Sequence, residues 1–125
     1  MAELSETARQ LLSEANIVHL ATVMPDGSPQ VTPIWADLAG DMIEFNTATG
    51  RVKERNMRRD PRVAFSVVSS DDPYERAYVR GRVVEMIEGD EARAHIDTMA
   101  KKYLGTDTYP WYHGETRVLV RVEPV

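Results

Sequence analysis

A tight turn between two runs of β-type residues is the feature that most restricts the fold. Residues 16–24 (NIVHLATVM) and residues 29–38 (PQVTPIWADL) are rich in strand formers, and PDGS lies between them. Proline, aspartate and glycine favour a turn, so the two runs predict a β-hairpin. Residues 39–41 (AGD) predict a second turn before a strand over residues 42–47. The three runs together predict consecutive antiparallel strands.

The rest of the chain adds three more strands and three short helices. Helix formers and apolar residues at helical spacing predict helices over residues 5–15, 51–59 and 90–104, whereas alternation predicts strands over residues 62–70, 75–88 and 116–124. Gly81 within the longest strand predicts a bulge or a bend. Six strands, mostly in hairpin order, with short peripheral helices predict a mainly-β fold that forms a closed or nearly closed antiparallel barrel.

Length and composition narrow the class of protein. The 125 residues are expected to form one domain over residues 1–125, and 42% apolar with 28% charged residues are ordinary globular values. The chain has no cysteine and three separated histidines, so neither a disulfide nor a metal site is expected. We expect His19 in the core and His95 on a solvated helix flank. No segment approaches the roughly 20 apolar residues of a membrane span, which predicts a cytoplasmic protein without a membrane partner.

Positive charge is concentrated in one short stretch of an acidic chain. Between Arg51 and Arg62 six cations face two anions, although the net charge of the chain is -5. Such a cluster is either a solvent-exposed face or a binding site for an anion. Four of the cations are interpreted as a solvated helix face: Arg55, Arg58, Arg59 and Arg62.

The remaining two cations predict a phosphate site. Arg51 and Lys53 open a predicted helix directly after Thr47, Thr49 and Gly50 end a strand. Hydroxyls, backbone N–H groups, the helix dipole and two cations can therefore converge on one anion. Neither the Walker spacing nor a dinucleotide fingerprint is present, so a nucleoside triphosphate is not indicated. A small anionic ligand suits the short cluster and the negative net charge better than nucleic acid does.

Several of these motifs together resemble a known family. The chain is similar to the flavin and deazaflavin oxidoreductases of the pyridoxamine-phosphate-oxidase-like split β-barrel superfamily. The similarity lies in residues 46–68 (NTATGRVKERNMRRDPRVAFSVV), in DGSPQVTPIWADL before them and in YVRGRV after them. The resemblance is closest to the branch that uses coenzyme F420, and it covers nearly the whole chain. It implies a split barrel of the FMN-binding type and a homodimer with two equivalent cofactors in grooves between the subunits.

The resemblance also implies which residues contact the cofactor. The phosphate would be held by Thr47, Thr49, Arg51 and Lys53, and the neighbouring Asn46, Ala48, Asn56 and Met57 belong to the same site. The isoalloxazine or deazaisoalloxazine ring would lie beside Val31, Thr32, Pro33, Ile34 and Trp35. Barrel packing is the alternative role for Trp35. Trp111 and Tyr112, in an aromatic loop, are expected to reach the groove of the partner subunit.

The implied chemistry belongs to the cofactor. Reduced deazaflavin donates a hydride from a ring carbon, so no protein nucleophile and no catalytic triad are expected. The expected function is an oxidoreductase that uses reduced F420 to reduce an unsaturated or conjugated small organic acceptor, protonated by solvent or by a tyrosine such as Tyr74 or Tyr78. Three alternatives stay open: an FMN-dependent oxidase or reductase of the same fold, a cofactor-binding protein without turnover, and, ranked last, a surface that docks nucleic acid or protein.

Overall fold

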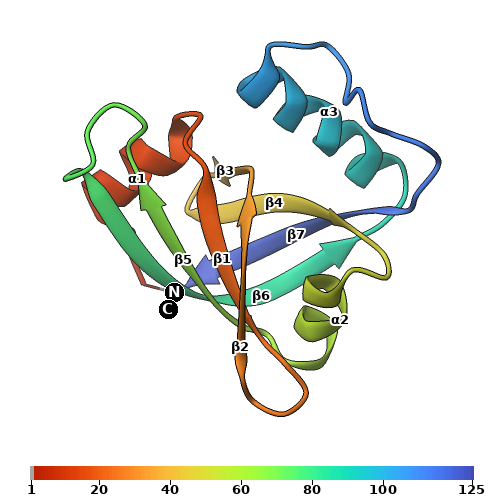
Figure 1. Ribbon diagram of the computed structural model, residues 1–125, viewed down its shortest axis with the longest axis horizontal. Coiled ribbons are helices and arrows are strands. Elements are labelled where there is room, and N and C mark those ends of the chain that lie inside the picture. The colour runs from red at the N-terminus through yellow and green to blue at the C-terminus, as the bar shows by residue number, and fades with distance from the viewer. Residues whose placement is uncertain (1) are drawn as a thin grey trace.

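One curled antiparallel sheet and three helices make up the fold. The computed structural model describes residues 2–125. Its helices are α1 (Glu6–Ser13), α2 (Val52–Arg59) and α3 (Asp90–Leu104), and its strands are β1 (Val18–Val23), β2 (Pro29–Ile34), β3 (Ala36–Ala39), β4 (Met42–Ala48), β5 (Arg62–Val68), β6 (Arg76–Ile87) and β7 (Arg117–Pro124). Figure 1 shows the strands wrapped into a partly closed barrel with the helices at its periphery. The predicted mainly-β barrel is confirmed.

The sheet contains seven strands, in the order β2-β1-β5-β6-β7-β4-β3. The predicted six or so strands are seven, because the run over residues 29–38 is interrupted at Trp35. Before the interruption Ile34 pairs with Val18 of β1, and after it Ala36 pairs with Phe45 of β4. One extended segment therefore joins the two ends of the sheet order, and this connection curls the sheet into a barrel.

Alternate residues of the strands fill the interior of the barrel. Leu20, Phe45, Phe65 and Val120 are at most 3% exposed, and the rings of Phe45 and Phe65 meet edge to face with centroids 6.1 Å apart. Burial of aromatic and branched apolar side chains is the main stabilising contribution in such a core. The helix α1 packs its buried leucines against the same core.

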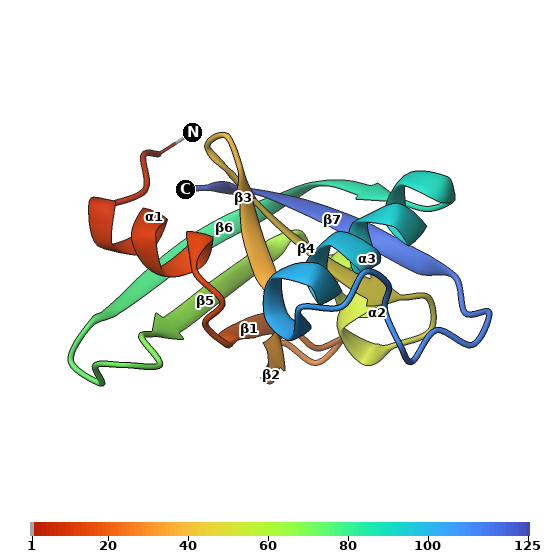
Figure 2. The same cartoon turned by 90° about the horizontal axis from the view of Figure 1, so that it is seen from above.

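Helix α3 covers the opposite face of β4 and β7, as Figures 1 and 2 show. Successive side chains of a strand point to opposite faces, so Phe45 enters the barrel while Asn46 points towards α3. The side-chain nitrogen of Asn46 donates a hydrogen bond of 3.0 Å to the carbonyl of Ala92. The helix ends at Gly105, whose positive φ of 76° suits a helix C-terminus. Across residues 2–125, no helix combines the length and the apolar character that crossing a bilayer requires.

Gly81 does not form the predicted bulge. The irregularity in the pairing of β6 with β7 lies between Val83 and Glu85. Gly81 instead marks a close approach of two strands, because an added Cβ would overlap Val122 and lie 3.2 Å from the carbonyl oxygen of Glu123. A side chain is therefore excluded at this position by the neighbouring strand.

Two histidines also lie elsewhere than predicted. His19 is exposed rather than part of the core, because the alternation along β1 turns Val18 and Leu20 inward. His95 is half-buried rather than on a solvated flank, and its Nδ1 lies 3.0 Å from the side-chain nitrogen of Asn46. The exposure of His19 follows from the alternation of β1, and the burial of His95 follows from the packing of α3 against β4 and β7, which the sequence around His95 does not specify.

Candidate functional site

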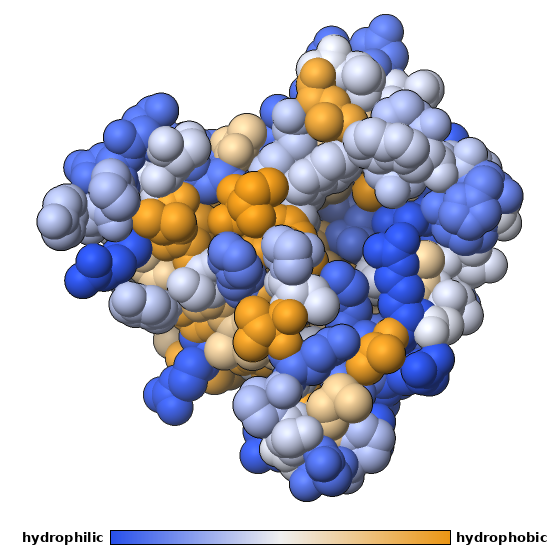
Figure 3. Space-filling model, viewed as in Figure 1, coloured by the Kyte–Doolittle hydropathy of each residue, from blue (hydrophilic) through white to orange (hydrophobic). Residues whose placement is uncertain are grey.

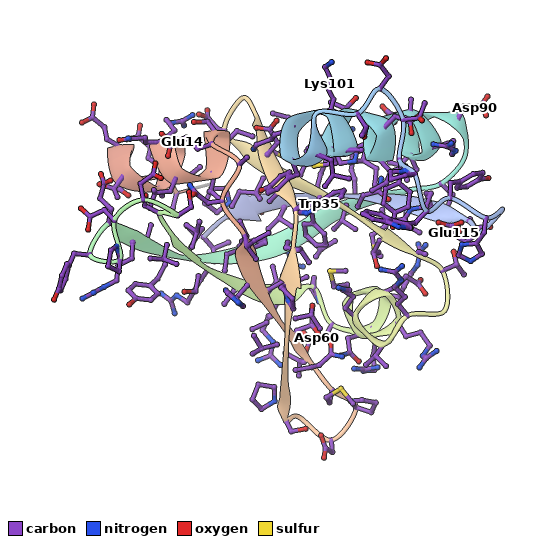
Figure 4. All side chains as sticks on the ribbon, turned by 45° about the horizontal axis from the view of Figure 1, so that its top comes forward. Glu14, Trp35, Asp60, Asp90, Lys101 and Glu115 are labelled. Carbon is purple, nitrogen blue, oxygen red and sulfur yellow. The ribbon has the colours of Figure 1, made fainter. Side chains whose placement is uncertain are left out.

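A cavity of about 300 Å³ opens between α3, α2 and the Trp35 interruption. Figure 3 shows hydrophilic side chains beside a hollow between α3 and α2, and Figure 4 shows Trp35 beneath α3. The cavity is lined by Ile17, Pro33, Ile34, Trp35, Asn46, Arg51, Lys53, Ile96, Met99, Tyr109, Trp111 and Arg117. Seven of the predicted cofactor-binding residues are in this lining: Pro33, Ile34, Trp35, Asn46, Arg51, Lys53 and Trp111.

Three cations form one wall of the cavity. Lys53 is half-buried, and its ammonium donates to the hydroxyl of Thr32 at 3.0 Å. Burial lowers the pKa of Lys53, and the nearby positive charges of Arg51 and Arg117 lower it further. Within residues 2–125, neither Lys53 nor Arg51 forms an ion pair with a carboxylate. An anionic ligand would relieve this accumulation of positive charge.

Arg117 is the cation that the sequence analysis missed. Its side chain is only 3% exposed, and its guanidinium donates to Glu115 at 3.0 Å and to the side-chain amide oxygen of Asn46 at 2.9 Å. Burial would raise the pKa of Glu115, but hydrogen bonds from the backbone N–H of His113 and from Arg117 hold it at about 2. The Arg117 charge is therefore partly balanced by an ionised carboxylate that points away from bulk solvent.

Aromatic side chains also line the cavity. The indole of Trp35 stacks on Tyr103, with ring centroids 5.3 Å apart and an angle of 12° between the planes. Tyr109 meets Trp35 edge to face at 6.1 Å and Trp111 at 5.6 Å. Tyr109 was not predicted, although it lies in the aromatic loop that the sequence singled out. A flat apolar wall beside a cationic wall suits a ligand with a ring and an anionic group.

Other cations of the basic stretch bind to the protein itself. Arg58 pairs with Glu54 at 2.8 Å, and Arg62 pairs with Asp60 at 2.7 Å. Arg55 and Arg59 each donate to a backbone carbonyl at 2.6 Å. All four are exposed, which agrees with the interpretation of Arg55, Arg58 and Arg59 as a solvated helix face, whereas Arg62 lies at the start of β5 and not on the helix. Of the six cations, two line the cavity, Arg51 and Lys53.

Part of the predicted phosphate site does not line the cavity. The Thr47 side chain is buried inside the barrel, and its hydroxyl has no hydrogen-bond partner within the described residues. Its neighbour Asn46 lines the cavity, because adjacent residues of a strand face opposite sides. Thr49 is exposed, and its hydroxyl donates to Glu88 at 3.2 Å. The side chains of Thr47 and Thr49 therefore do not converge with Lys53 in this structure.

The other predicted residues outside the lining have different surroundings. Asn56 is buried, and its amide donates to Thr22 at 3.0 Å. Val31 is 61% exposed and lines a second groove, on the outer face of β1, β5 and β6. The remaining four are Thr32, whose hydroxyl accepts from Lys53, Ala48 and Met57, which are buried, and Tyr112, whose ring centroid lies 3.8 Å beneath the Arg93 guanidinium. Cofactor contact for these residues stays a prediction.

Comparison with known proteins identifies the family. The family model described as pyridoxamine 5'-phosphate oxidase matches residues 4–125. The chain belongs to the pyridoxamine 5'-phosphate oxidase family. The fold and the F420-linked branch that the sequence resembles are both supported by a solved structure named F420 reductase, which is 36% identical over 98% of this chain and 96% of that one, with a TM-score of 0.87.

Two further structures resemble this member of the pyridoxamine 5'-phosphate oxidase family. A conserved hypothetical protein from Mycobacterium tuberculosis is 27% identical to this chain, with a TM-score of 0.74. The match covers 97% of this chain and 81% of that protein. A protein of unknown function from Agrobacterium tumefaciens is 23% identical over 91% of this chain and 50% of its own, with a TM-score of 0.71, and shows the shared fold. In the described part of this family member, no cluster of three or more acidic or histidine side chains is arranged to hold a metal ion.

Proposed function

We propose that this protein is an oxidoreductase that uses reduced coenzyme F420 to transfer hydride to an unsaturated or conjugated small organic acceptor. The observation that carries the proposal is the half-buried Lys53, which has no carboxylate partner among residues 2–125 and lies near Arg51 and Arg117 in a cavity that aromatic side chains also line. Family membership and 36% identity to a structure named F420 reductase support the cofactor class.

The residues of the cavity fit both parts of such a cofactor. Lys53 and Arg51, which have no carboxylate partner among the described residues, would bind the phosphate of the cofactor. The Pro33 to Trp35 segment, in which Pro33 has no backbone N–H, would lie beside the flat ring of the cofactor. When bound, the cofactor supplies the hydride. The protein's contribution is to fix the phosphate, to hold Trp35 through its stack on Tyr103, and to exclude water with the apolar side chains of α3.

An FMN-dependent enzyme of the same fold is the second candidate, because FMN also joins a phosphate to a flat tricycle. Titrating the purified protein with F420 and with FMN tests the choice, and tighter binding of F420 is expected. Tighter binding of FMN would favour the second candidate. Replacing both Arg51 and Lys53 by glutamate should abolish binding of either cofactor with an unchanged circular dichroism spectrum, whereas Lys101→Glu, on the exposed face of α3, should not.

Turnover separates an enzyme from a cofactor-binding protein. Reduced F420 is to be mixed with the protein and with a panel of quinones, enones and tetrapyrroles, and its reoxidation followed by absorbance. Acceleration by at least one acceptor class is expected. Tight binding without acceleration by any of them would favour a protein that only carries the cofactor.

The proposal includes a homodimer with cofactors between the subunits. Its support is a groove of about 670 Å³ on the outer face of β1, β5 and β6 that contains Val31, 61% exposed, and Tyr78, 74% exposed. Exposed apolar side chains that gather in one groove are typical of interaction surfaces. Light scattering should give a dimer for the wild type and a monomer for Tyr78→Glu, with Tyr74→Glu, at an exposed tyrosine outside the groove, as the matched control. A dimeric Tyr78→Glu variant would contradict this assignment.

A further inference from the structure

A chain of hydrogen bonds leads from α3 to the cavity. His95 of α3 and Asn46 of β4 approach to 3.0 Å between Nδ1 and the side-chain nitrogen. The same amide nitrogen donates to the carbonyl of Ala92 at 3.0 Å. On the other side, the amide oxygen of Asn46 accepts from Nε of Arg117 at 2.9 Å. Three segments far apart in the sequence thus meet at one amide group.

The partners of Asn46 assign the protonation state of His95. The Ala92 carbonyl can only accept and the Arg117 guanidinium can only donate, so the amide nitrogen must face α3 and the amide oxygen must face Arg117. Nδ1 of His95 then faces a donor and has to be the acceptor. This requires a neutral imidazole whose proton is on Nε2.

The orientation of Arg117 depends on this amide. The guanidinium is held on one side by Glu115 and on another by Asn46, and its central carbon lies 5.2 Å from the centroid of the Tyr109 ring. Because its side chain is 3% exposed, water cannot readily replace a lost partner. Asn46 and Arg117 both line the cavity, whereas His95 does not.

We infer that His95 is a positioning residue: by accepting from Asn46 it fixes the amide that holds the Arg117 guanidinium on the cavity wall. Geometry alone carries the hydrogen-bond relay from His95 to Arg117. What Arg117 is positioned for, the anionic group of a bound ligand, rests on the proposed function. Without the acceptor on His95, the amide nitrogen of Asn46 keeps only the carbonyl of Ala92 as a partner. The amide is then held less firmly, and the Arg117 guanidinium loses an acceptor with a fixed position.

Protonation of His95 has the same effect as removal of the acceptor. A protonated Nδ1 can no longer accept from Asn46 and faces a donor instead. Charged groups from each element packed around His95 act on it: Glu44 of β4, Arg121 of β7, Asp37 of β3 and Glu91 of α3. Burial outweighs the carboxylates and lowers the pKa of His95, so the neutral, accepting form prevails at neutral pH. In mildly acidic solution the cation should turn away from Asn46 towards Glu44.

Two substitutions separate the acceptor from the imidazole. His95→Asn keeps an oxygen near the place of Nδ1 but does not titrate, and His95→Leu removes the acceptor. Ala94→Leu, at an exposed neighbouring position of α3, is the matched control for the new leucine. Solvent exchange of the Arg117 Nε proton, measured by NMR on the ¹⁵N-labelled full-length chain, should be about tenfold faster in His95→Leu than in the wild type, and close to the wild-type rate in the other two.

A pH series tests the effect of His95 protonation without relying on the folding of the His95→Leu variant. The ratio of the Arg117 Nε exchange rate in the wild type to that in His95→Asn is measured from about pH 7.5 to about pH 5. The ratio should rise as His95 takes up its proton. A flat ratio, or wild-type exchange in a folded His95→Leu variant, would overturn the role of His95.

Binding experiments separate this inference from the proposed function. His95→Leu should bind F420 and FMN about tenfold more weakly than Ala94→Leu does. If the wild type binds neither cofactor, the proposed function fails, whereas the exchange rate of Arg117 still decides whether His95 positions it. Equal cofactor affinities combined with faster exchange would overturn the link from Arg117 to the ligand.

Discussion

Replacing Lys53 by methionine tests the cationic wall directly, because it removes the charge and keeps most of the side-chain volume. The ammonium of Lys53 is half-buried and has one hydrogen bond, to Thr32. Its lowered pKa, caused by burial and by Arg51 and Arg117, means that the folded protein binds this proton less tightly than the unfolded chain does. Stability without ligand should therefore increase on substitution, while ligand affinity should decrease.

Both magnitudes follow from the contacts of the ammonium. Lys53 has three N–H donors, one of which is bonded to Thr32, so two remain for a ligand. One charge-assisted hydrogen bond to a phosphate contributes about 1.5–3 kcal/mol, which corresponds to roughly 10- to 150-fold weaker binding in Lys53→Met. The free energy of unfolding of the ligand-free protein should rise by about 0.5–2 kcal/mol, the range typical of a single stabilising substitution.

Fluorescence titration with F420 and with FMN measures the affinity, and urea unfolding of the ligand-free protein measures the stability. Lys101→Met is the matched control, since Lys101 is exposed on the outer side of α3, as Figure 4 shows. Wild-type affinity of Lys53→Met for the better-binding cofactor would refute the assignment of Lys53 to the phosphate. A loss of stability in the ligand-free variant would refute the argument from its buried charge.

Three further substitutions test the fold around the site. Gly81→Ala should lower the free energy of unfolding by about 1–3 kcal/mol because the new Cβ overlaps Val122; urea unfolding measures this, and wild-type stability would contradict the close approach. Tyr103→Phe leaves the backbone N–H of Ala36 without its acceptor at 3.1 Å and should cost about 1–3 kcal/mol; an unchanged urea midpoint would show that water replaces the hydroxyl. Glu115 has a pKa of about 2 in the folded protein, so its contribution to the free energy of unfolding is present above pH 4.5 and is lost as the pH falls towards 2. In Glu115→Gln the free energy of unfolding should therefore depend less on pH between 4.5 and 2. The same pH dependence as in the wild type would contradict this role of Glu115.

Local patterns in the sequence predict most of the secondary structure but not the closure of the barrel. The hairpin of β1 and β2 follows from alternation and turn residues, and both predicted ends of α3 agree with the structure. The interruption at Trp35 does not follow from them, since residues 29–38 read as one strand with strand-forming residues on both sides. The segment is divided because Ile34 pairs with β1 and Ala36 pairs with β4, and the sequence does not show that β5, β6 and β7 separate these two strands in the sheet.

The candidate site was predictable where its residues are close in sequence. Arg51 and Lys53 stand out because they open a helix after a strand, and both line the cavity. Arg117 lies at the start of the last strand, where a single arginine carries no signal of its own. The strand period alone offered one further deduction: Asn46 and Thr47 face opposite sides of β4, so the two could not both line a site on one face.

The source of the positive potential at the cavity also differs from the prediction. The predicted site combined the helix dipole and free backbone N–H groups with two cations, but Glu54 occupies the start of α2. Its carboxylate accepts from the backbone N–H of Gly50 at 2.9 Å and pairs with Arg58, while the N–H of Arg51 donates to Ala48. A carboxylate there offsets much of the helix dipole. Anion binding therefore depends on the side chains that line the cavity, which makes it sensitive to single substitutions at Lys53 and, through Asn46, to the protonation of a histidine outside the cavity.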